Sequence, residues 1–235
     1  MTVRNLNLVE SLYADLRRRL QTSDVGPEDR LVDTDIAAAY GTSRMPAREA
    51  LLRLVAEGYL VGSTRGFVLP VLTVEDICGL FELRRQLEPR AAASAARDLT
   101  PQSAEALTVA MATIRQAHAE GNIKVLVQAN VDFRHAWVAC VRNPHMAATI
   151  SRFMDYFQPL RLQTFADART RQVYVEALGA LFDALTARDS LAAQDRMTAF
   201  LFSAEAAYLK AHARSAEEDA TARTSRRKHH NNQKN

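Results

Sequence analysis

The chain of 235 residues has few of the features that mark secreted, membrane-spanning or cysteine-rich proteins. Its two cysteines, Cys78 and Cys140, are too few for a disulfide scaffold or a four-thiolate metal site. No apolar run approaches the roughly 20 residues that a membrane-spanning helix needs. Residues 1–10 also lack the basic and then apolar pattern of a secretory signal. We therefore expect an ordinary globular protein in the reducing cytoplasm, without a membrane partner.

An excess of charge of one sign is missing from most of the chain. Residues 1–71 carry nine basic and nine acidic side chains, and residues 72–213 carry fifteen of each. The net charge of +3 comes from residues 214–235, which hold six basic and three acidic residues. Bulk charge gives no argument for nucleic-acid binding by the first two regions, so such a function requires a local cluster.

The hydrophobic pattern predicts a mainly α fold in two regions, followed by a tail. Between Leu8 and Leu20, leucines recur every four residues, as on one face of a helix, and two shorter helices and a hairpin complete residues 1–71. Residues 72–213 are almost entirely helical in pattern. Helices are expected there at about 73–96, 101–121, 123–141, 145–165, 170–187 and 190–213. Residues 214–235 are polar and are predicted to be disordered.

A tight turn at Gly41 separates the two short helices of the first region. This is the geometry that lets a second helix enter the major groove of DNA. Ser43 is expected to cap that helix, and Pro46 falls in its first turn, where proline is tolerated. Arg44 and Arg48 are four residues apart and share one face. Their planar guanidinium groups suit guanine edges or phosphates, so this face is the candidate DNA-reading surface.

The first region resembles the winged helix-turn-helix of GntR-family transcription regulators. The resemblance rests on residues 31–51, Glu57-Gly58 and the hairpin residues 65–68. In that family, the matching arginines and the wing contact operator DNA. The resemblance therefore implies DNA contacts by Ser43, Arg44, Met45, Arg48, Arg65 and Gly66. Met45 departs from the small polar residue usual there, which leaves the base preference at that step open. The alternative is that the arginines are only solvated surface charges.

The second region resembles the all-helical effector domain of the FadR-like branch of the same family. The similar motifs are Asp76-Ile77, residues 82–88 with the alanine run after them, Asn143-Pro144 and residues 184–189. Together the two resemblances cover about residues 8–212. They imply an N-terminal winged helix-turn-helix and a C-terminal bundle of six or seven helices, usually dimeric, that binds small carboxylates.

Many members of this branch hold a divalent metal through one Asp and three His, a ligand set that suits zinc, nickel or manganese. The matching positions of this chain hold Asn130, Arg134, Leu178 and Phe200. We therefore expect no metal cofactor. A shifted alignment would offer Asp132 and His135, which are three residues apart, but the last two helices provide no inward-facing histidine to complete that set.

Without a metal, the positive charge that attracts a carboxylate must come from side chains. Arg134 stands where the family has a metal ligand, and its guanidinium can bind a carboxylate through two hydrogen bonds. We predict a metal-free effector pocket with Arg134 as anchor, Asn130 as a hydrogen-bonding neighbour, and Arg84 or Arg85 in its lining. The alternative is an outward-facing Arg134 in a surface salt bridge.

These features favour a DNA-binding transcription regulator that responds to a small organic acid. A helix-turn-helix monomer covers few base pairs, so we expect a homodimer on a two-fold operator. In the family that the chain resembles, effector binding more often releases the protein from DNA, so the resemblance implies a repressor. Two alternatives stay open: a DNA-binding protein without an effector, and a helical enzyme fused to a DNA-binding head. The enzyme would need a set of catalytic groups, which the sequence does not show.

Overall fold

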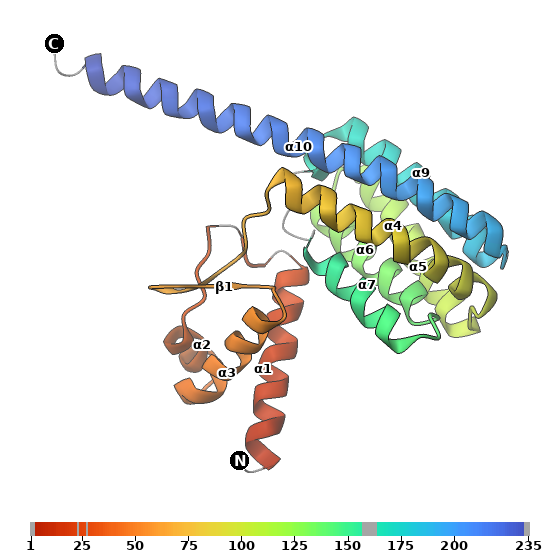
Figure 1. The fold of residues 1–235 in the computed structure, drawn as a ribbon, viewed down its shortest axis with the longest axis horizontal. Coiled ribbons are helices and arrows are strands. Elements are labelled where there is room, and N and C mark those ends of the chain that lie inside the picture. Colours follow the sequence, from red (N-terminus) through yellow and green to blue (C-terminus); the bar gives the residue numbers. More distant parts are fainter. Residues whose placement is uncertain (1–2, 23, 27, 157–163, 233–235) are drawn as a thin grey trace.

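The computed structural model describes residues 3–22, 24–26, 28–156 and 164–232, with only the backbone described for residues 3–7, 154–156 and 214–232. The chain forms a winged head and a helical bundle (Figure 1). The head contains α1 (Val3–Gln21), α2 (Asp33–Ala39), α3 (Arg44–Ala56), β1 (Val61–Ser63) and β2 (Gly66–Val68). The bundle contains α4 (Val74–Arg97), α5 (Pro101–Glu120), α6 (Ile123–Val138), α7 (Pro144–Tyr156), α9 (Ala168–Thr186) and α10 (Ser190–Asn232). Within the described ranges, no helix is both long and apolar enough to cross a membrane.

The core of the head forms where α1 and α2 pack against α3. The four-residue repeat of α1 turns Leu12 and Leu16 inward, and both are fully buried beside Leu51 and Leu54 of α3. Burying such side chains is the main favourable contribution to folding. The predicted leucine face of the first helix is confirmed. Its packing against Leu51 and Leu54 fixes the position of α3 in the head.

The turn between α2 and α3 follows the predicted course. Gly41 has a φ of +60°, a conformation that glycine adopts without a steric penalty. Ser43 is the N-cap residue of α3, but its side chain makes no capping hydrogen bond. Pro46 and Ala47 are buried in the first turn of α3, so the start of that helix packs on the head while its other face stays open.

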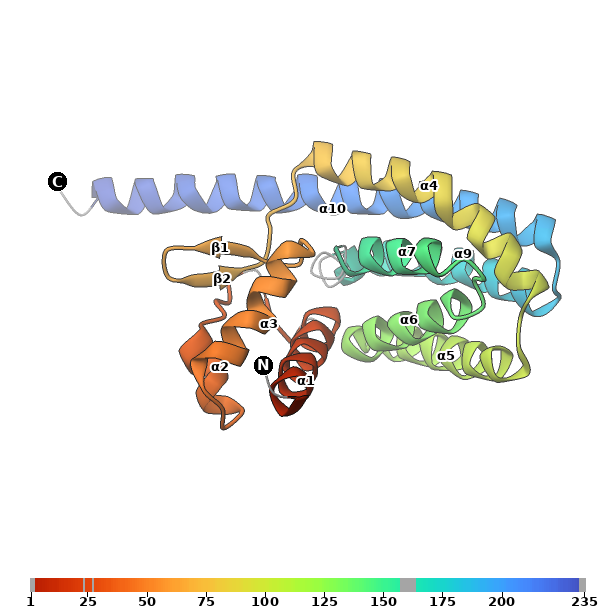
Figure 2. The same cartoon turned by 60° about the horizontal axis from the view of Figure 1, so that its bottom comes forward.

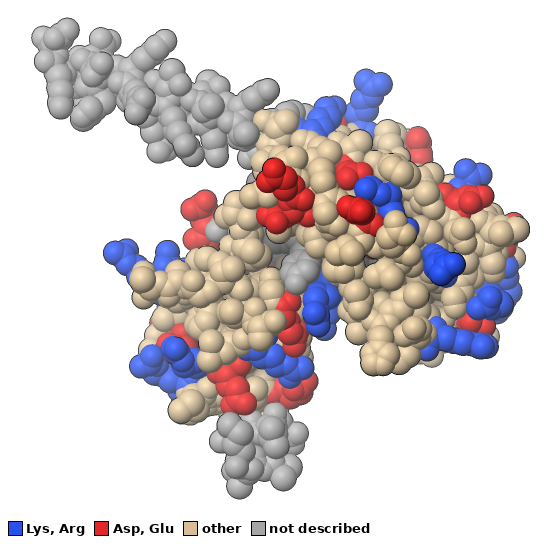
Figure 3. Space-filling model, viewed as in Figure 1, with Lys and Arg blue, Asp and Glu red and all other residues tan. Residues whose placement is uncertain are grey.

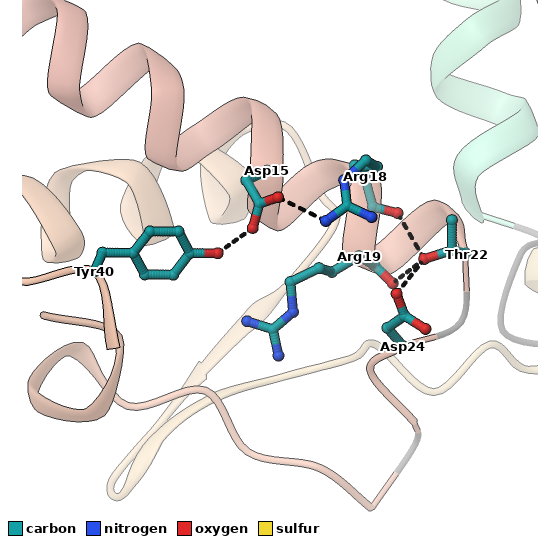
Figure 4. Close-up of polar contacts among 6 residues, drawn as sticks. All are labelled: Asp15, Arg18, Arg19, Thr22, Asp24 and Tyr40. Carbon is teal, nitrogen blue, oxygen red and sulfur yellow. Dashed lines mark hydrogen bonds and ion pairs between the residues drawn. The ribbon is translucent and has the colours of Figure 1, made fainter. Parts of the chain in front are cut away.

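Polar contacts fasten α1 to the end of α2 (Figure 4). The Tyr40 hydroxyl donates a hydrogen bond to the Asp15 carboxylate, which also pairs with Arg18 at 2.7 Å. These hydrogen bonds, that of Tyr40 first, lower the pKa of Asp15. Close by, the Thr22 hydroxyl lies 2.7 Å from the Asp24 carboxylate at the end of α1. The turn before α3 is therefore held from the side by a charged carboxylate.

Side-chain hydrogen bonds cap the first turns of several bundle helices. Thr73 and Asp76 form a reciprocal capping box at the start of α4. Thr100 caps α5, with Pro101 as its first residue, and Asp167 caps α9. The first and last helices of the bundle, α4 and α10, pack against each other, and α10 also packs against α9 (Figure 2).

Two of the predicted segments reach parts of the chain that the structure describes only incompletely. The helix expected at 145–165 is α7 up to Tyr156, and residues 157–163 lie outside the described part of the chain. The tail expected to be disordered beyond residue 213 instead continues α10 to Asn232. No glycine or proline follows residue 180, so residues 214–232 contain neither of the two residues that most disfavour a helix.

Candidate functional site

A hollow of about 550 Å³ lies between the start of α3 and the wing formed by β1 and β2. Arg44 and Arg48 of α3 line one side, Arg65 and Gly66 of the wing line the other, and Asp33 of α2 lies between them. Four of the six residues predicted to contact DNA therefore face one concave surface. The head has no lysine, so the blue side chains on it in Figure 3 are arginines, and acidic side chains lie beside them.

The other two predicted residues flank the hollow at the start of α3. Met45 is 71% exposed, which is unusual for a large apolar side chain and leaves it open to a partner. Ser43 is exposed, and its hydroxyl is not used to cap the helix. Both side chains therefore present themselves beside the arginines on the same end of α3.

Asp33, which the sequence analysis missed, is the acidic centre of the hollow. Its side chain is 7% exposed and accepts hydrogen bonds from Arg44 Nη2 at 3.1 and 3.2 Å and from Arg48 Nη1 at 3.3 Å. The Arg44 hydrogen bond is the main reason that the pKa of Asp33 lies below its usual value. The available signal was an acidic residue at the start of α2, which in isolation indicates only a favourable helix dipole interaction.

Gly66 brings the wing close to the chain before α2. Its φ is +129°, and a Cβ atom at this position would lie 2.6 Å from the Leu31 carbonyl oxygen. Leu31 exchanges two backbone hydrogen bonds of 2.8 Å with Phe67, the next residue. Arg65, exposed at the turn of the wing, is held over the hollow by this pairing. Gly66 thus has a backbone role that no other residue can fill without strain.

The bundle contains a second group of arginines around a carboxylate, and here all members are buried. Arg84 donates to Glu88 through Nε at 2.6 Å and through Nη2 at 3.3 Å. Arg134 Nη2 lies 3.9 Å from the same carboxylate. Burial is the largest single influence on the pKa of Arg84 and lowers it, but the charge of Glu88, the hydrogen bond to Glu88 and nearby tyrosines together raise the pKa above its ordinary value. Arg134 is therefore inward-facing, and the alternative of an exposed surface pair does not match the structure.

The positions that hold metal ligands in related proteins do not suit a metal here. Asn130 is buried and donates a hydrogen bond to the Tyr174 hydroxyl at 2.8 Å, while Leu178 and Phe200 belong to the apolar core. A guanidinium such as that of Arg134 has no lone pair to offer a cation. No three His, Cys, Asp or Glu side chains come together within the described ranges. In the shifted alternative, Asp132 and His135 are both exposed.

Two further observations define the surroundings of this cluster. Arg85, predicted as a possible lining residue, instead pairs with Glu205 of α10 and lies over the Phe202 ring at 5.0 Å, apart from Glu88. A groove of about 330 Å³ between α9 and α10 reaches Tyr174, the partner of Asn130. The Oδ1 atom of Asn130 accepts no hydrogen bond from any described residue.

Comparison with known families matches both parts of the chain. Residues 8–66 match the family described as "Bacterial regulatory proteins, gntR family", and residues 79–202 match the family described as "FCD domain". Both describe transcription regulators rather than enzymes.

Individual relatives agree with these matches. The HTH-type transcriptional regulator McbR of Escherichia coli is 30% identical over 135 residues, which is 57% of this chain but only 61% of that protein. The HTH-type transcriptional regulator YdhC of Bacillus subtilis is 21% identical over 80% of this chain and 84% of its own. The aligned part of this chain thus spans about three fifths of McbR.

Solved structures show the same fold. The E. coli McbR/YncC structure superposes with a TM-score of 0.77 at 24% identity, covering 90% of this chain and 100% of that one. A putative GntR regulator from Rhodococcus sp. RHA1 has a TM-score of 0.70 at 22% identity, covering 89% and 99%. At these identities the likeness concerns the fold alone. With its head and most of its bundle matched, the chain belongs to the GntR family of transcription regulators and carries a C-terminal FCD effector-binding domain.

Proposed function

We propose that this regulator binds a two-fold operator as a homodimer and is released from it by a small organic acid bound in the helical bundle. The observation that carries the DNA part is the hollow of the head, where three arginines from two elements converge. A repressor acts in this way when the form without effector has the higher affinity for DNA.

The proposed DNA contacts come from the start of α3 and from the wing. In this proposal, Arg44 and Arg48 meet base edges or phosphates in the major groove, and Arg65 contacts the neighbouring phosphate backbone. A good bidentate arginine–guanine contact discriminates by about 1–3 kcal/mol. The remaining proposed contacts are Ser43 and Met45 beside the arginines, and Gly66 through close approach of its backbone.

The proposed dimer contact lies on the bundle. Large apolar side chains that are about half exposed occur on α4 and α10, as in Val74, Leu83 and Phe202. Exposed apolar side chains mark an interaction site where they adjoin one another, so these positions are candidates for the subunit contact. A two-fold dimer through the bundle would present two heads to two half-sites of one operator.

The proposed effector site is the buried arginine cluster with Asn130. Arg84 and Arg134 supply two guanidinium groups, which bind carboxylates with charge-assisted hydrogen bonds. Asn130 Oδ1, which accepts nothing from the described residues, supports a ligand that also carries a hydroxyl or amino donor. Arg85 is engaged with Glu205, so we place it outside the proposed site.

A short structural route supports coupling of this cluster to the head. Arg134 faces the cluster, and the next residue, His135, lines a cleft of about 650 Å³ between α6, α7 and the head. Tyr13 and Arg17 of α1 line the opposite side of that cleft. A displacement of α6 by a ligand would therefore reach the head directly, and couplings of this kind are typically worth about 1–3 kcal/mol.

In vitro selection from random duplex DNA tests the DNA part. We expect the full chain to enrich a two-fold sequence, and Arg48→Ala to bind the enriched duplex about 10-fold more weakly or worse. Arg142→Ala is the matched control, because Arg142 is exposed in the bundle and pairs with Asp98. Equal losses in the two variants, or no enrichment, would contradict the proposal.

Thermal unfolding with lactate, glycolate, succinate or benzoate tests the effector part. At least one acid should raise the melting temperature of the wild type and weaken its binding to the enriched duplex. Asn130→Leu should reduce both effects for hydroxy acids without removing DNA binding. An acid that stabilises the protein but leaves DNA affinity unchanged would favour the alternative of a DNA-binding protein without effector response.

A further inference from the structure

The carboxylate of Asp33 lies behind the two arginines that α3 presents to the proposed DNA surface. Arg44 reaches both of its oxygens through one nitrogen, Nη2, and Arg48 reaches Oδ2 through Nη1. The side chain of Asp33 is 7% exposed, whereas those of Arg44 and Arg48 are 65% and 55% exposed. The acid is thus inside the hollow, and most of each arginine remains available to a partner.

We propose that Asp33 is a positioning residue that orients Arg44 and Arg48 for one DNA sequence and weakens binding to all others. The inference rests on the proposed DNA-binding function of this surface. It assigns Asp33 no contact with DNA, because only 7% of its side chain is exposed.

Orientation follows from the shared acceptor. A free arginine side chain samples many rotamers, and a fixed guanidinium loses less freedom when it meets its partner. Asp33 holds one terminal nitrogen of each arginine, which restricts the orientations that each guanidinium can adopt before DNA arrives. A base-edge contact needs this planar alignment, whereas a phosphate contact tolerates many directions.

Charge gives the second effect. The two arginines present two positive charges, and Asp33 cancels one of them at a distance of 3.1–3.3 Å. Affinity for any DNA rises with each positive charge that displaces counterions from the backbone. The acid therefore lowers sequence-independent affinity while it supports the sequence-specific contacts, and the ratio of the two affinities increases.

A purely structural role of Asp33 predicts a different result. As the first residue of α2, an acidic side chain also stabilises the helix through its dipole. Loss of that contribution would weaken the head and reduce affinity for every duplex alike. Asp35 offers a matched control, since it occupies the same first turn, is exposed, and accepts a hydrogen bond from Thr34 rather than from an arginine.

The test compares the full chain with Asp33→Asn and Asp35→Asn on two duplexes, the one enriched by the wild type and a scrambled version of equal length. For Asp33→Asn we expect affinity for the scrambled duplex to rise about 3- to 8-fold at 0.1 M salt, with a salt slope steeper by about 0.9. Affinity for the enriched duplex should not rise, so the ratio falls. Asp35→Asn should leave the ratio within about twofold of the wild type.

The outcomes separate this inference from the proposed function. If the wild type enriches no sequence, the proposed function fails. If it does enrich one and Asp33→Asn lowers both affinities equally, or leaves their ratio unchanged, only the role of Asp33 is overturned. Should Asp33→Asn not fold, Asp33→Glu keeps the charge and displaces the carboxylate. That variant is then expected to lose affinity for the enriched duplex alone, and an unchanged ratio would overturn the inference.

Discussion

The winged head and the helical bundle each place one carboxylate between two arginines, in opposite environments. In the head, Asp33 binds two arginines whose side chains are more than half exposed. In the bundle, Glu88 binds Arg84, and the side chains of both are at most 1% exposed. The same arrangement of charges can therefore orient side chains at an exposed site or stabilise the fold at a buried one. Exposed pairs add little to stability but direct side chains, whereas a buried group must remain complete for the fold to persist.

Of the changes considered, removal of the buried charge of Glu88 should lower the stability of the protein most. Glu88→Gln leaves two buried guanidinium groups facing a neutral amide, and such losses typically cost about 3–5 kcal/mol of stability. Urea unfolding of the full chain measures this change. Glu205→Gln is the control, because its partner Arg85 is only partly buried, and we expect a loss of at most about 1 kcal/mol. Similar losses in both variants would show that burial does not distinguish the two sites.

A change of the wing tests how far the head depends on backbone geometry. Gly66→Ala forces a left-handed conformation on alanine and places a Cβ against Leu31, so we expect about 1–3 kcal/mol of destabilisation. Binding to the enriched duplex should weaken as well, because the wing shifts away from the hollow. Gly62→Ala is the matched control, since a Cβ there meets no atom within 4 Å. Equal losses of stability and DNA binding in the two variants would show that the close approach of Gly66 to Leu31 is not important for the head.

In the head, the Tyr13 hydroxyl donates a hydrogen bond to the Glu57 carboxylate. We expect titration of this tyrosine to make the stability of the protein depend on alkaline pH. Burial first, and then the hydrogen bond to Glu57, raises the pKa of Tyr13 to about 12 from 10.0. The folded state therefore holds a proton that the unfolded chain releases between pH 10 and 12, and stability falls across that window. Tyr13→Phe should flatten this part of the profile by about 1 kcal/mol after allowance for solvent screening. An unchanged profile in urea unfolding would contradict the assignment.

Loss of the Asp33 charge, whose arginine partners are exposed, should have the smallest effect on stability. The pKa of Asp33 is lowered by its arginines, so its stabilising contribution is present above the ordinary value of 3.8 and is lost as the pH falls below it. At neutral pH, Asp33→Asn should shift the urea midpoint less than Gly66→Ala does. A shift as large as that of Glu88→Gln would mean that the head also depends on a complete charge group.

Most elements of the head could be predicted from local patterns. The leucine repeat, Gly41, Pro46 and the hairpin glycines each fix a helix, a turn or a strand pair without long-range information. Arg44, Arg48 and Arg65 line one hollow as their spacing and the family resemblance suggest. Asp33 could not be identified in this way, because its burial depends on how α2 packs against α3 and the wing.

The bundle was less predictable, since its contacts join distant segments. The four-residue spacing of Arg84 and Glu88 is visible in the sequence. The contact of Glu88 with Arg134, however, depends on the packing of α4 against α6. Arg84 and Arg85 are neighbours with equal charge, and only the helix orientation turns one inward and the other to Glu205. The effector contacts stay a prediction, as do the DNA contacts.

The packing of α10 against α4 has a consequence for the order of events during synthesis. The head is complete within the first 70 or so residues, whereas α4 ends at Arg97 and α10 begins only at Ser190. At about 5–20 residues per second, the ribosome needs roughly 5–20 s to supply the missing partner. During this interval the apolar face of α4 is without its final cover. We therefore expect the nascent bundle to be the stage at which chaperones engage the chain, after the head has already folded.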